Sequence, residues 1–345
     1  MVRTIGGMVA VVLAVAGCSL NTTGVGSDRQ PELAHSGVGT GATSGLDEPD
    51  STSGAADDPS ESGPSAGTGS PVPVLVISDD EIFEFGGQDI GTTAEHTFVI
   101  TNEGSRVAMD LAVGGLGKPF TVHSSDCESV LAPEDTCRVV VHFAPELFGG
   151  YEGQLEVAFE GAGGADSVVR PFTGRGVGTT GNLLRNGGGE QGSLDEHPPL
   201  GWESLAGASW ASTAELSYMG DYSIFAGLAA GSDEFILFQS IDAAGLTNWG
   251  DAEGVRFYYR AYHRGWDLNN DLTQVSVRFS DAQEQELEQH PTGIYSSNTW
   301  MESTGDHEAP PRTHDVQMFL ECHYVSGYEC GGYFDEVELW AEWSG

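Results

Sequence analysis

The chain has 345 residues, with 13 Lys and Arg against 52 Asp and Glu, and its formal net charge is −39. A protein this acidic repels a phosphate backbone, so we expect no nucleic-acid partner. The length allows two or three domains.

The first 17 residues have the pattern of an export signal. Arg3 precedes an apolar segment of about a dozen residues, which is shorter than the roughly 20 that a membrane-spanning helix needs. The run Ala16-Gly17-Cys18 resembles the lipobox of bacterial lipoproteins. This resemblance implies a lipoprotein signal peptide at residues 1–17, a lipidated Cys18 and anchoring to the bacterial cell envelope, at the outer membrane because Ser19 is not Asp. Ordinary secretion with cleavage after Ala16 is the alternative.

Residues 18–73 are predicted to form a disordered tether. Gly, Ser, Thr, Pro, Asp and Glu dominate this stretch, and no aromatic residue precedes Phe83. Such a segment cannot bury enough apolar surface to offset the conformational entropy lost on ordering.

Four cysteines follow Cys18, and they fall into two closely spaced pairs. No Cys-x-x-Cys spacing or histidine cluster accompanies them, so disulfides are favoured over a metal site in an exported protein. We predict the bridges Cys127–Cys137 and Cys322–Cys330.

Residues 74–178 are predicted to form an immunoglobulin-like β-sandwich, because short alternating strands are separated by Gly, Asn and Pro turns. The pairs and runs Phe85-Gly86, Phe98 to Gly104, and Cys127 to Tyr151 resemble bacterial repeats of the ASPM/SPD-2/Hydin type (choice-of-anchor D type). The resemblance implies a spacer or protein-contact domain. His96, His123 and His142 fall one to a strand or loop, so we expect isolated residues that lie at the surface or have their hydrogen bonds satisfied, and not metal ligands.

Residues 182–345 contain all seven tryptophans. The opening Asn182 to Glu190 with Pro199-Leu200-Gly201-Trp202, the turn Gly220 to Ser223, and the ending Gly332 to Trp340 resemble carbohydrate-binding-module-like jelly rolls of the galactose-binding fold. The resemblance implies an all-β jelly roll with Trp202 and Trp340 in its core.

In that family a structural calcium often sits where the first and last strands meet. Carried over by position, Glu190 and Asp335 are the candidate Ca²⁺ ligands, since carboxylate oxygens suit a hard cation. Solvated turn residues are the alternative interpretation.

The predicted strand from Val255 to Arg264 carries the candidate ligand surface. Alternation places Val255, Phe257, Tyr259 and Ala261 on one side and an arginine and tyrosine ladder on the other. Planar guanidinium donors and tyrosine rings suit sugar hydroxyls and the C–H face of a pyranose, and the arginines concentrate positive charge locally. The predicted carbohydrate-binding residues are Arg256, Tyr258, Arg260, Tyr262, and the loop residues Trp249 and Trp300. The alternative is that the arginines only neutralise neighbouring acids.

The sequence contains no recognisable catalytic motif, such as a Gly-x-Ser-x-Gly elbow or a His-Glu-x-x-His helix, and we therefore assign no catalytic residue and no catalytic cofactor. We expect a surface lipoprotein whose terminal jelly roll binds carbohydrate, such as an acidic or matrix glycan, without turning it over. The alternatives are a structural or adhesion lipoprotein with a surface protein as its partner, and an accessory polysaccharide hydrolase.

Overall fold

The computed structural model describes residues 72–345 except 80, 162, 195, 229–232 and 267–270. The predicted signal peptide, Cys18 and nearly all of the predicted tether lie outside these described residues. The described part is all-β, as predicted, with 19 strands and one short 3₁₀ helix and no α-helix. No helix among the described residues is long and apolar enough to span a membrane.

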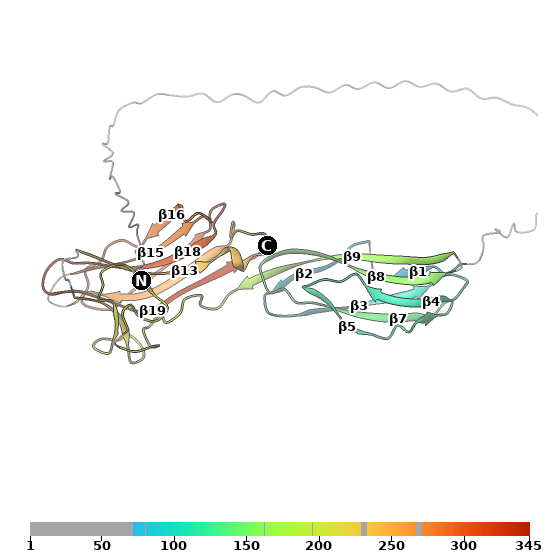
Figure 1. The fold of residues 1–345 in the computed structure, drawn as a ribbon, viewed down its shortest axis with the longest axis horizontal. Coiled ribbons are helices and arrows are strands. Elements are labelled where there is room, and N and C mark those ends of the chain that lie inside the picture. The colour runs from blue at the N-terminus through green and yellow to red at the C-terminus, as the bar shows by residue number, and fades with distance from the viewer. Residues whose placement is uncertain (1–71, 80, 162, 195, 229–232, 267–270) are drawn as a thin grey trace, which may run out of the picture. The chain divides into compact units, whose positions relative to one another are not determined.

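The first sandwich is built from β1 to β9, of which the labelled strands lie together in Figure 1. One sheet has the order β1-β3-β7-β5, and the other has the order β2-β9-β8-β4-β6, in which β2 and β9 run parallel. Phe98, Phe120, Phe143 and Phe172 come from both sheets and are at most 1% exposed, which places the hydrophobic core between the sheets. The strand bounds are β1 (Leu75–Ile77), β2 (Phe83–Asp89), β3 (Ala94–Asn102), β4 (Ala108–Gly114), β5 (Phe120–Ser125), β6 (Val130–Leu131), β7 (Thr136–Phe143), β8 (Gly149–Gly161) and β9 (Gly164–Thr179).

The second sandwich is built from β10 to β19, with one sheet in the order β10-β13-β18-β15-β16 and the other in the order β11-β12-β19-β14-β17. Its strands pair antiparallel, as expected for a jelly roll. The bounds are β10 (Glu203–Ala206), β11 (Ala211–Thr213), β12 (Ser223–Leu228), β13 (Glu234–Asp242), η1 (Ala244–Leu246), β14 (Arg256–Arg264), β15 (Leu272–Ser280), β16 (Glu286–Pro291), β17 (Met301–Glu308), β18 (Asp315–His323) and β19 (Glu329–Trp343).

Large rings and one histidine fill the space between the sheets of the second sandwich. Trp202 is buried as predicted, and its indole N–H donates to the carbonyl of Asn186 at 3.1 Å. His263 is fully buried and lies 2.7 Å from the hydroxyl oxygen of Thr273 and 2.8 Å from that of Ser303. Burial lowers the pKa of His263 to about 4. This histidine therefore serves as a neutral hydrogen-bonded bridge between strands of the two sheets.

Both predicted disulfides are confirmed. Cys127 bonds to Cys137 at the start of β7, and Cys322 of β18 bonds to Cys330 of β19. The second bridge joins the two sheets of its sandwich, because β18 and β19 belong to different sheets.

The chain passes from the first sandwich to the second through paired backbone. Strand β9 continues far enough for Gly178 and Thr179 to pair with the end of β19. The N–H of Phe148 donates to the carbonyl of Leu246 at 2.9 Å, and the ring of Phe148 is fully buried among second-sandwich residues. Gly149 has a φ of +124°, and a Cβ at this position would overlap the side chain of Asn248. The join between the two sandwiches is thus made of backbone hydrogen bonds and a buried ring.

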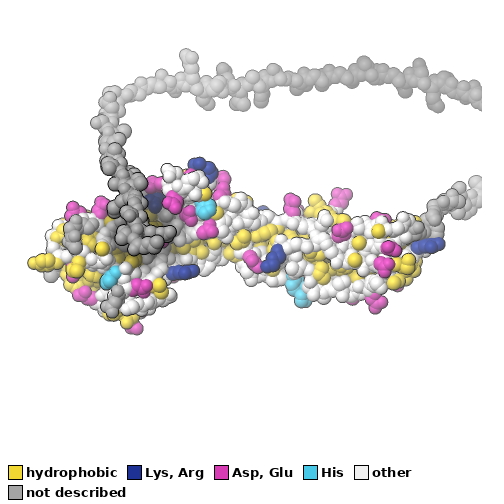
Figure 2. Space-filling view, in the orientation of Figure 1, with side chains coloured by type: hydrophobic (Ala, Val, Ile, Leu, Met, Phe, Trp, Pro, Cys, Tyr) yellow, Lys and Arg dark blue, Asp and Glu magenta, His cyan; other side chains and the backbone are white. Residues whose placement is uncertain are grey.

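Acidic side chains are spread widely over the surface. On the side drawn in Figure 2, Asp and Glu side chains are scattered over both sandwiches, while Lys and Arg are sparse. Any concentration of arginine on one face therefore stands out against its surroundings.

Candidate functional site

Strand β14 carries most of the predicted binding residues. Its side chains alternate between buried and half-buried along its whole length, because a pleated strand turns successive side chains to opposite faces. Phe257, Tyr259 and Ala261 lie in the core, with 1%, 5% and 0% of their surface exposed. The predicted alternation is therefore confirmed. We call the opposite side the Arg–Tyr face, and it consists of Arg256, Tyr258, Arg260 and Tyr262.

The Arg–Tyr face occupies the outer surface of its sheet. Strand β14 pairs with β17 on one side and with β19 on the other, so each outward residue has two cross-strand neighbours. Tyr258 stands opposite Asp306 and Trp340, and Arg260 stands opposite Thr304 and Glu338. These neighbours determine the chemistry of the face.

Acidic side chains pair with both arginines of the Arg–Tyr face. Arg256 donates to Asp306 at 2.6 Å and to Glu308 at 3.1 Å, and Arg260 lies 2.7 Å from the carboxylate of Glu338. The hydrogen bond to Asp306 raises the pKa of Arg256, and the charge of Glu338 raises the pKa of Arg260. The predicted local excess of positive charge is wrong, because β17 and β19 place an acid beside each of these guanidinium groups. Both arginine side chains nevertheless remain about 40% exposed.

Aromatic rings flank the arginines on the same surface. The ring of Tyr258 is stacked with Trp340, with centroids 5.6 Å apart and planes at 9°. The ring of Tyr262 is stacked on Tyr218 at 3.8 Å, and Tyr218 meets Trp300 edge to face at 5.9 Å. Trp340 is half-buried on the outer surface and not in the core, which corrects the expectation from the sequence motif. The pattern of β14 could not reveal Trp340 or Tyr218, since they come from other segments.

Tyr262 contacts Tyr218 on one side and Glu302 on the other. Its hydroxyl donates to Glu302 of β17 at 2.9 Å. Hydrogen bonding with Tyr218 and with Glu302 raises the pKa of Tyr262, so the phenol stays protonated under ordinary conditions. Its single hydroxyl hydrogen is donated to Glu302, so toward a ligand the oxygen of Tyr262 acts as a hydrogen-bond acceptor.

The two predicted loop tryptophans lie at different ends of the face. Trp300 contacts Tyr218, which is stacked on Tyr262 at one end of the face. Trp249 packs against Trp343 with ring centroids 5.3 Å apart. Trp343 lines a hollow of about 360 Å³ together with Arg256 and Tyr258. The remaining lining residues are Gly254, Glu308, Glu342, Ser344 and Gly345. The Arg–Tyr face thus has a recess at its Arg256 end.

The predicted calcium ligands lie beside a turn that carries Tyr218. One carboxylate oxygen of the fully buried Asp335 accepts hydrogen bonds from the N–H groups of Tyr218 and Met219, at 2.7 and 3.0 Å. One oxygen of Glu190 accepts from the N–H groups of Asp221 and Tyr222, at 2.9 and 2.8 Å. Both acids therefore hold the turn that places Tyr218 over the Arg–Tyr face.

The oxygen donors that would suit Ca²⁺ are partly gathered here. The second oxygen of Asp335 and a carboxylate oxygen of Glu336 both lie within 4 Å of the position that a Cβ on Gly188 would occupy, whereas the carboxylate of Glu190 turns toward Gly220. Burial raises the pKa of Asp335 to about 6. A nearby cation would favour the ionised form of Asp335, so the oxygen donors here fit calcium. Glu190 and Asp335 as the calcium ligands stay a prediction.

The outer surface of the opposite sheet carries a second aromatic group that the sequence did not reveal. Phe238 and Phe319 are stacked with centroids 5.4 Å apart, and the guanidinium carbon of Arg278 lies 4.6 Å from the centre of the Phe319 ring. Phe319 is only 3% exposed, so it offers little ring surface to a ligand. The Arg–Tyr face is the better candidate surface.

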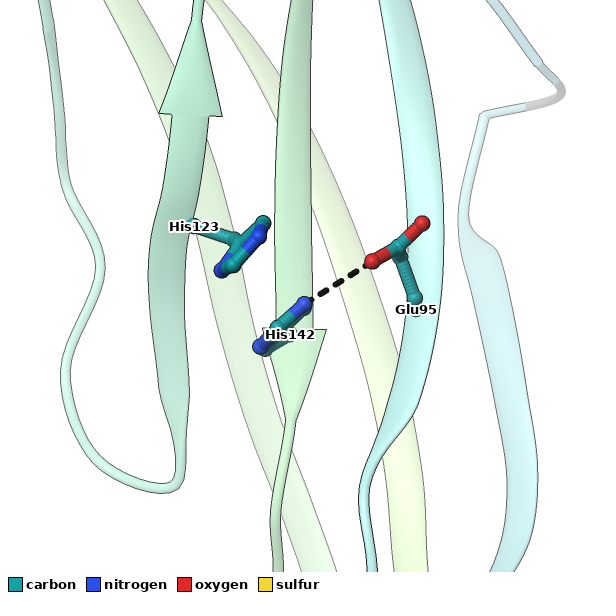
Figure 3. Close-up of side chains that lie close together, drawn as sticks. All are labelled: Glu95, His123 and His142. Atoms are coloured by element: carbon teal, nitrogen blue, oxygen red, sulfur yellow. Dashed lines mark hydrogen bonds and ion pairs between the residues drawn. The ribbon is translucent and has the colours of Figure 1, made fainter.

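Histidines of the first sandwich are not all isolated, which corrects the expectation from the sequence. The rings of His123 and His142 are stacked with centroids 4.0 Å apart and planes at 12°. The Nε2 atom of His142 lies 2.9 Å from a carboxylate oxygen of Glu95, and Figure 3 shows the three side chains reaching toward one another from neighbouring strands.

Comparisons with known proteins agree with the fold of the first sandwich. Residues 74–170 match the family model described as HYDIN/CFA65/VesB-like, Ig-like domain. The match confirms the immunoglobulin-like prediction for this part of the chain. No curated protein matches the sequence.

Several solved structures resemble parts of the chain. The VesB protease of Vibrio cholerae is 22% identical with a TM-score of 0.27. The match covers 29% of this chain and 31% of the protease. The structure named Family 16 Carbohydrate Binding Module-2 is 17% identical with a TM-score of 0.34, over 46% of this chain and 99% of that one. The CBM22-1 xylan-binding domain of Paenibacillus barcinonensis Xyn10C is 13% identical with a TM-score of 0.34, over 44% and 93% of the two chains. At these identities and TM-scores, we draw no conclusion about function from these structures.

Proposed function

We propose that the second sandwich binds carbohydrate on the Arg–Tyr face and releases it unchanged. The observation that carries this proposal is the alternation of β14, which turns two tyrosines and two arginines outward on one sheet surface. A pyranose presents an apolar C–H face and a rim of hydroxyl groups, so its binding surface needs exposed rings interleaved with polar donors and acceptors. The Arg–Tyr face supplies both.

The rings are held in place before any ligand arrives. Tyr262 is covered on one side by Tyr218, whose own surface is 43% exposed, and Tyr258 lies beside Trp340. Stacking and cross-strand pairing limit the rotamers of these side chains, so little conformational entropy remains to be lost on binding.

The charges of the face favour an uncharged glycan over an acidic one. Both arginines are already paired with carboxylates, and the chain as a whole has a net charge of −39. An acidic polymer would be repelled by a chain of this net negative charge. Guanidinium groups donate hydrogen bonds to sugar hydroxyls, and carboxylate groups accept hydrogen bonds from them. We therefore propose a neutral polysaccharide as the ligand.

Display at the cell surface is the second part of the proposal. A lipid on Cys18 and the acidic, Gly- and Ser-rich segment to residue 73 would hold both sandwiches away from an outer membrane. The first sandwich would then act as a spacer or as a contact for a surface protein. Radiolabelled palmitate tests the anchor, since Cys18→Ser should abolish lipid incorporation.

A glycan array probed with the protein tests the binding proposal. The double variant Tyr258→Ala, Tyr262→Ala is expected to weaken binding of any neutral glycan hit at least about tenfold, which corresponds to about 1.4 kcal/mol. Phe238→Ala removes a ring from the opposite sheet and is the matched control, which should bind like the unaltered protein. Equal binding by the double variant, or no glycan hit at all, would overturn the proposal.

A reducing-end assay separates binding from hydrolysis. The protein is incubated with each polysaccharide that it binds, and the expected result is no release of new reducing ends. Any turnover that survives purification, and that the Tyr258→Ala, Tyr262→Ala variant lacks, would show that the face belongs to a hydrolase. Capture of a surface protein that is lost in the same variant, without glycan binding, would favour adhesion.

A further inference from the structure

Three neighbouring strands of the first sandwich bring metal-ligating side chains to one spot. Strand β7 lies between β3 and β5, and Glu95 of β3 is the cross-strand partner of His142 on β7. The register between β5 and β7 shifts between Val122 and Ser124, which leaves His123 at a β-bulge. A bulge redirects the side chain of the extra residue, and here it turns His123 over the ring of His142 (Figure 3).

The donor atoms of this group are close enough for a small cation. One ligand atom from each of Glu95, His123 and His142 can be chosen so that all three lie within 4.8 Å of one another. Zinc bonds of about 2.0–2.1 Å to nitrogen or oxygen in tetrahedral geometry place the ligand atoms about 3.3 Å apart. The three ligand atoms therefore need to move only a short distance toward one another to bind an ion. His123 and Glu95 are exposed, so they can move without disturbing the core.

The arrangement requires one ring to turn when an ion binds. The two imidazole planes are at 12° and their lone pairs lie within those planes, so stacked rings cannot both point at one ion. Rotation of the exposed His123 side chain about its Cβ–Cγ bond brings its nitrogen toward the Nε2 atom of His142. The ion then takes the position between His142 and Glu95, which are now joined by a 2.9 Å hydrogen bond.

We propose that Glu95, His123 and His142 form a three-ligand site for a divalent transition metal ion, of which Zn²⁺ is the best fit. Two imidazole nitrogens with one carboxylate are a donor set of zinc-type sites, whereas Ca²⁺ and Mg²⁺ prefer oxygen donors alone. Metal ions bind the neutral imidazole, and the negative charge of Glu95 within a strongly acidic chain attracts a cation. The fourth coordination position faces solvent and takes water.

The other residues of this kind do not compete. Among the described residues, the second group with three donor atoms as close together is Asp126, Cys127 and Cys137, but its cysteines form a disulfide and are lost as ligands. In the second sandwich, His290 and His307 are stacked at 3.8 Å with Glu288 near His290. Their donor atoms are not gathered in the same way, which makes this pair a matched control.

Calorimetric titration of Zn²⁺ into the full chain, expressed without a histidine tag, tests the site. We expect one zinc ion per chain bound by the first sandwich. Glu95→Gln, His123→Ala and His142→Ala should each weaken binding by at least about tenfold, since the loss of outer-shell partners alone costs 10–100-fold. His307→Ala should leave the affinity unchanged. Circular dichroism checks that each variant is folded.

Cobalt supplies a second readout that a merely structural effect would not move. Co²⁺ bound by two histidines and a carboxylate should give visible absorption bands, and these should disappear in His123→Ala and remain in His307→Ala. Titration with Ca²⁺ should give no heat that depends on His123. Zinc binding that is unaffected by all three substitutions, or that is lost equally in His307→Ala, would overturn the proposal.

Discussion

The outer surfaces of the two sandwiches assemble their polar groups in different ways. In the second sandwich, a single strand supplies Arg256, Tyr258, Arg260 and Tyr262, and neighbouring strands add the acids that pair with them. In the first sandwich, Glu95, His142 and His123 come from three strands and meet only because of strand register and a bulge. The residues of the Arg–Tyr face can therefore be found by their spacing along one strand. The group of Glu95, His123 and His142 exists only after the sheet has formed.

Histidine shows the same contrast. His123 and His142 stand on the surface of the first sandwich beside a carboxylate, whereas His263 of the second is fully buried between two hydroxyl groups. Solvent reaches the surface pair, whereas burial holds His263 in its neutral form. Position in the sheet therefore decides what the same side chain does.

The largest expected effect tests whether the two cores are separate. Phe98→Ala leaves a cavity in the first core and is expected to lower its free energy of unfolding by about 3–5 kcal/mol. All seven tryptophans follow residue 200, so tryptophan fluorescence reports the second sandwich alone, while circular dichroism reports both. The denaturation curve should shift by circular dichroism and stay in place by fluorescence.

The matched variant Phe334→Ala removes a fully buried ring from the second core and should shift the fluorescence transition. If Phe98→Ala moves that transition just as far, the sandwiches unfold as one unit and the comparison between them fails.

A smaller effect follows from the buried histidine. The pKa of His263 is about 4 in the folded protein and about 6.5 in an unfolded chain. Between these values the unfolded state binds a proton that the folded state does not, so stability falls as pH falls from 6.5 toward 4. The loss approaches about 3 kcal/mol at pH 4 and is absent above pH 7. Fluorescence-monitored unfolding of His263→Gln should show a shallower pH dependence.

His123→Gln is the control for this measurement. Its imidazole is exposed on the first sandwich, so the pH dependence of the second sandwich should stay as it is in the unaltered protein. An equal slope in the His263→Gln variant would show that carboxylates, and not this histidine, cause the acid sensitivity.

Calcium gives an effect of similar or smaller size. If Glu190 and Asp335 ligate Ca²⁺, adding the ion at 100 times its dissociation constant should stabilise the second sandwich by about 2.7 kcal/mol. The chelated protein is titrated with Ca²⁺ and, in parallel, with Mg²⁺, and the melting temperature is followed by tryptophan fluorescence. A melting temperature that does not respond to Ca²⁺ would remove the predicted site and leave both acids as supports of the turn that carries Tyr218.

The smallest effect is expected on the Arg–Tyr face. Arg260 and Glu338 are 2.7 Å apart, but both are partly exposed, and exposed pairs contribute between zero and about 1 kcal/mol. A double-mutant cycle with Arg260→Met and Glu338→Gln should therefore give a coupling energy below about 1 kcal/mol. A much larger coupling would mean that the face is built for stability, which would weaken the case for a ligand surface.

Local patterns were enough to predict much of the fold. Turn residues between short alternating segments indicated the first sandwich, the resemblance of several motifs to jelly rolls indicated the second, and close spacing indicated both disulfides, Cys127–Cys137 and Cys322–Cys330. The alternation of β14 indicated which side chains face outward. These features depend on neighbouring residues in the chain, and a strand has a period of two wherever it lies.

The sequence by itself thus determined the all-β class, the disulfide pairing and the outward residues of β14. Only the tertiary structure decided that Asp306, Glu308 and Glu338 neutralise the arginines, that Trp340 and Tyr218 join the tyrosines, and that His123 meets His142. Strand order, register and bulges set these contacts. These three features depend on the packing of the whole sheet, so the spacing of residues along the chain does not reveal them.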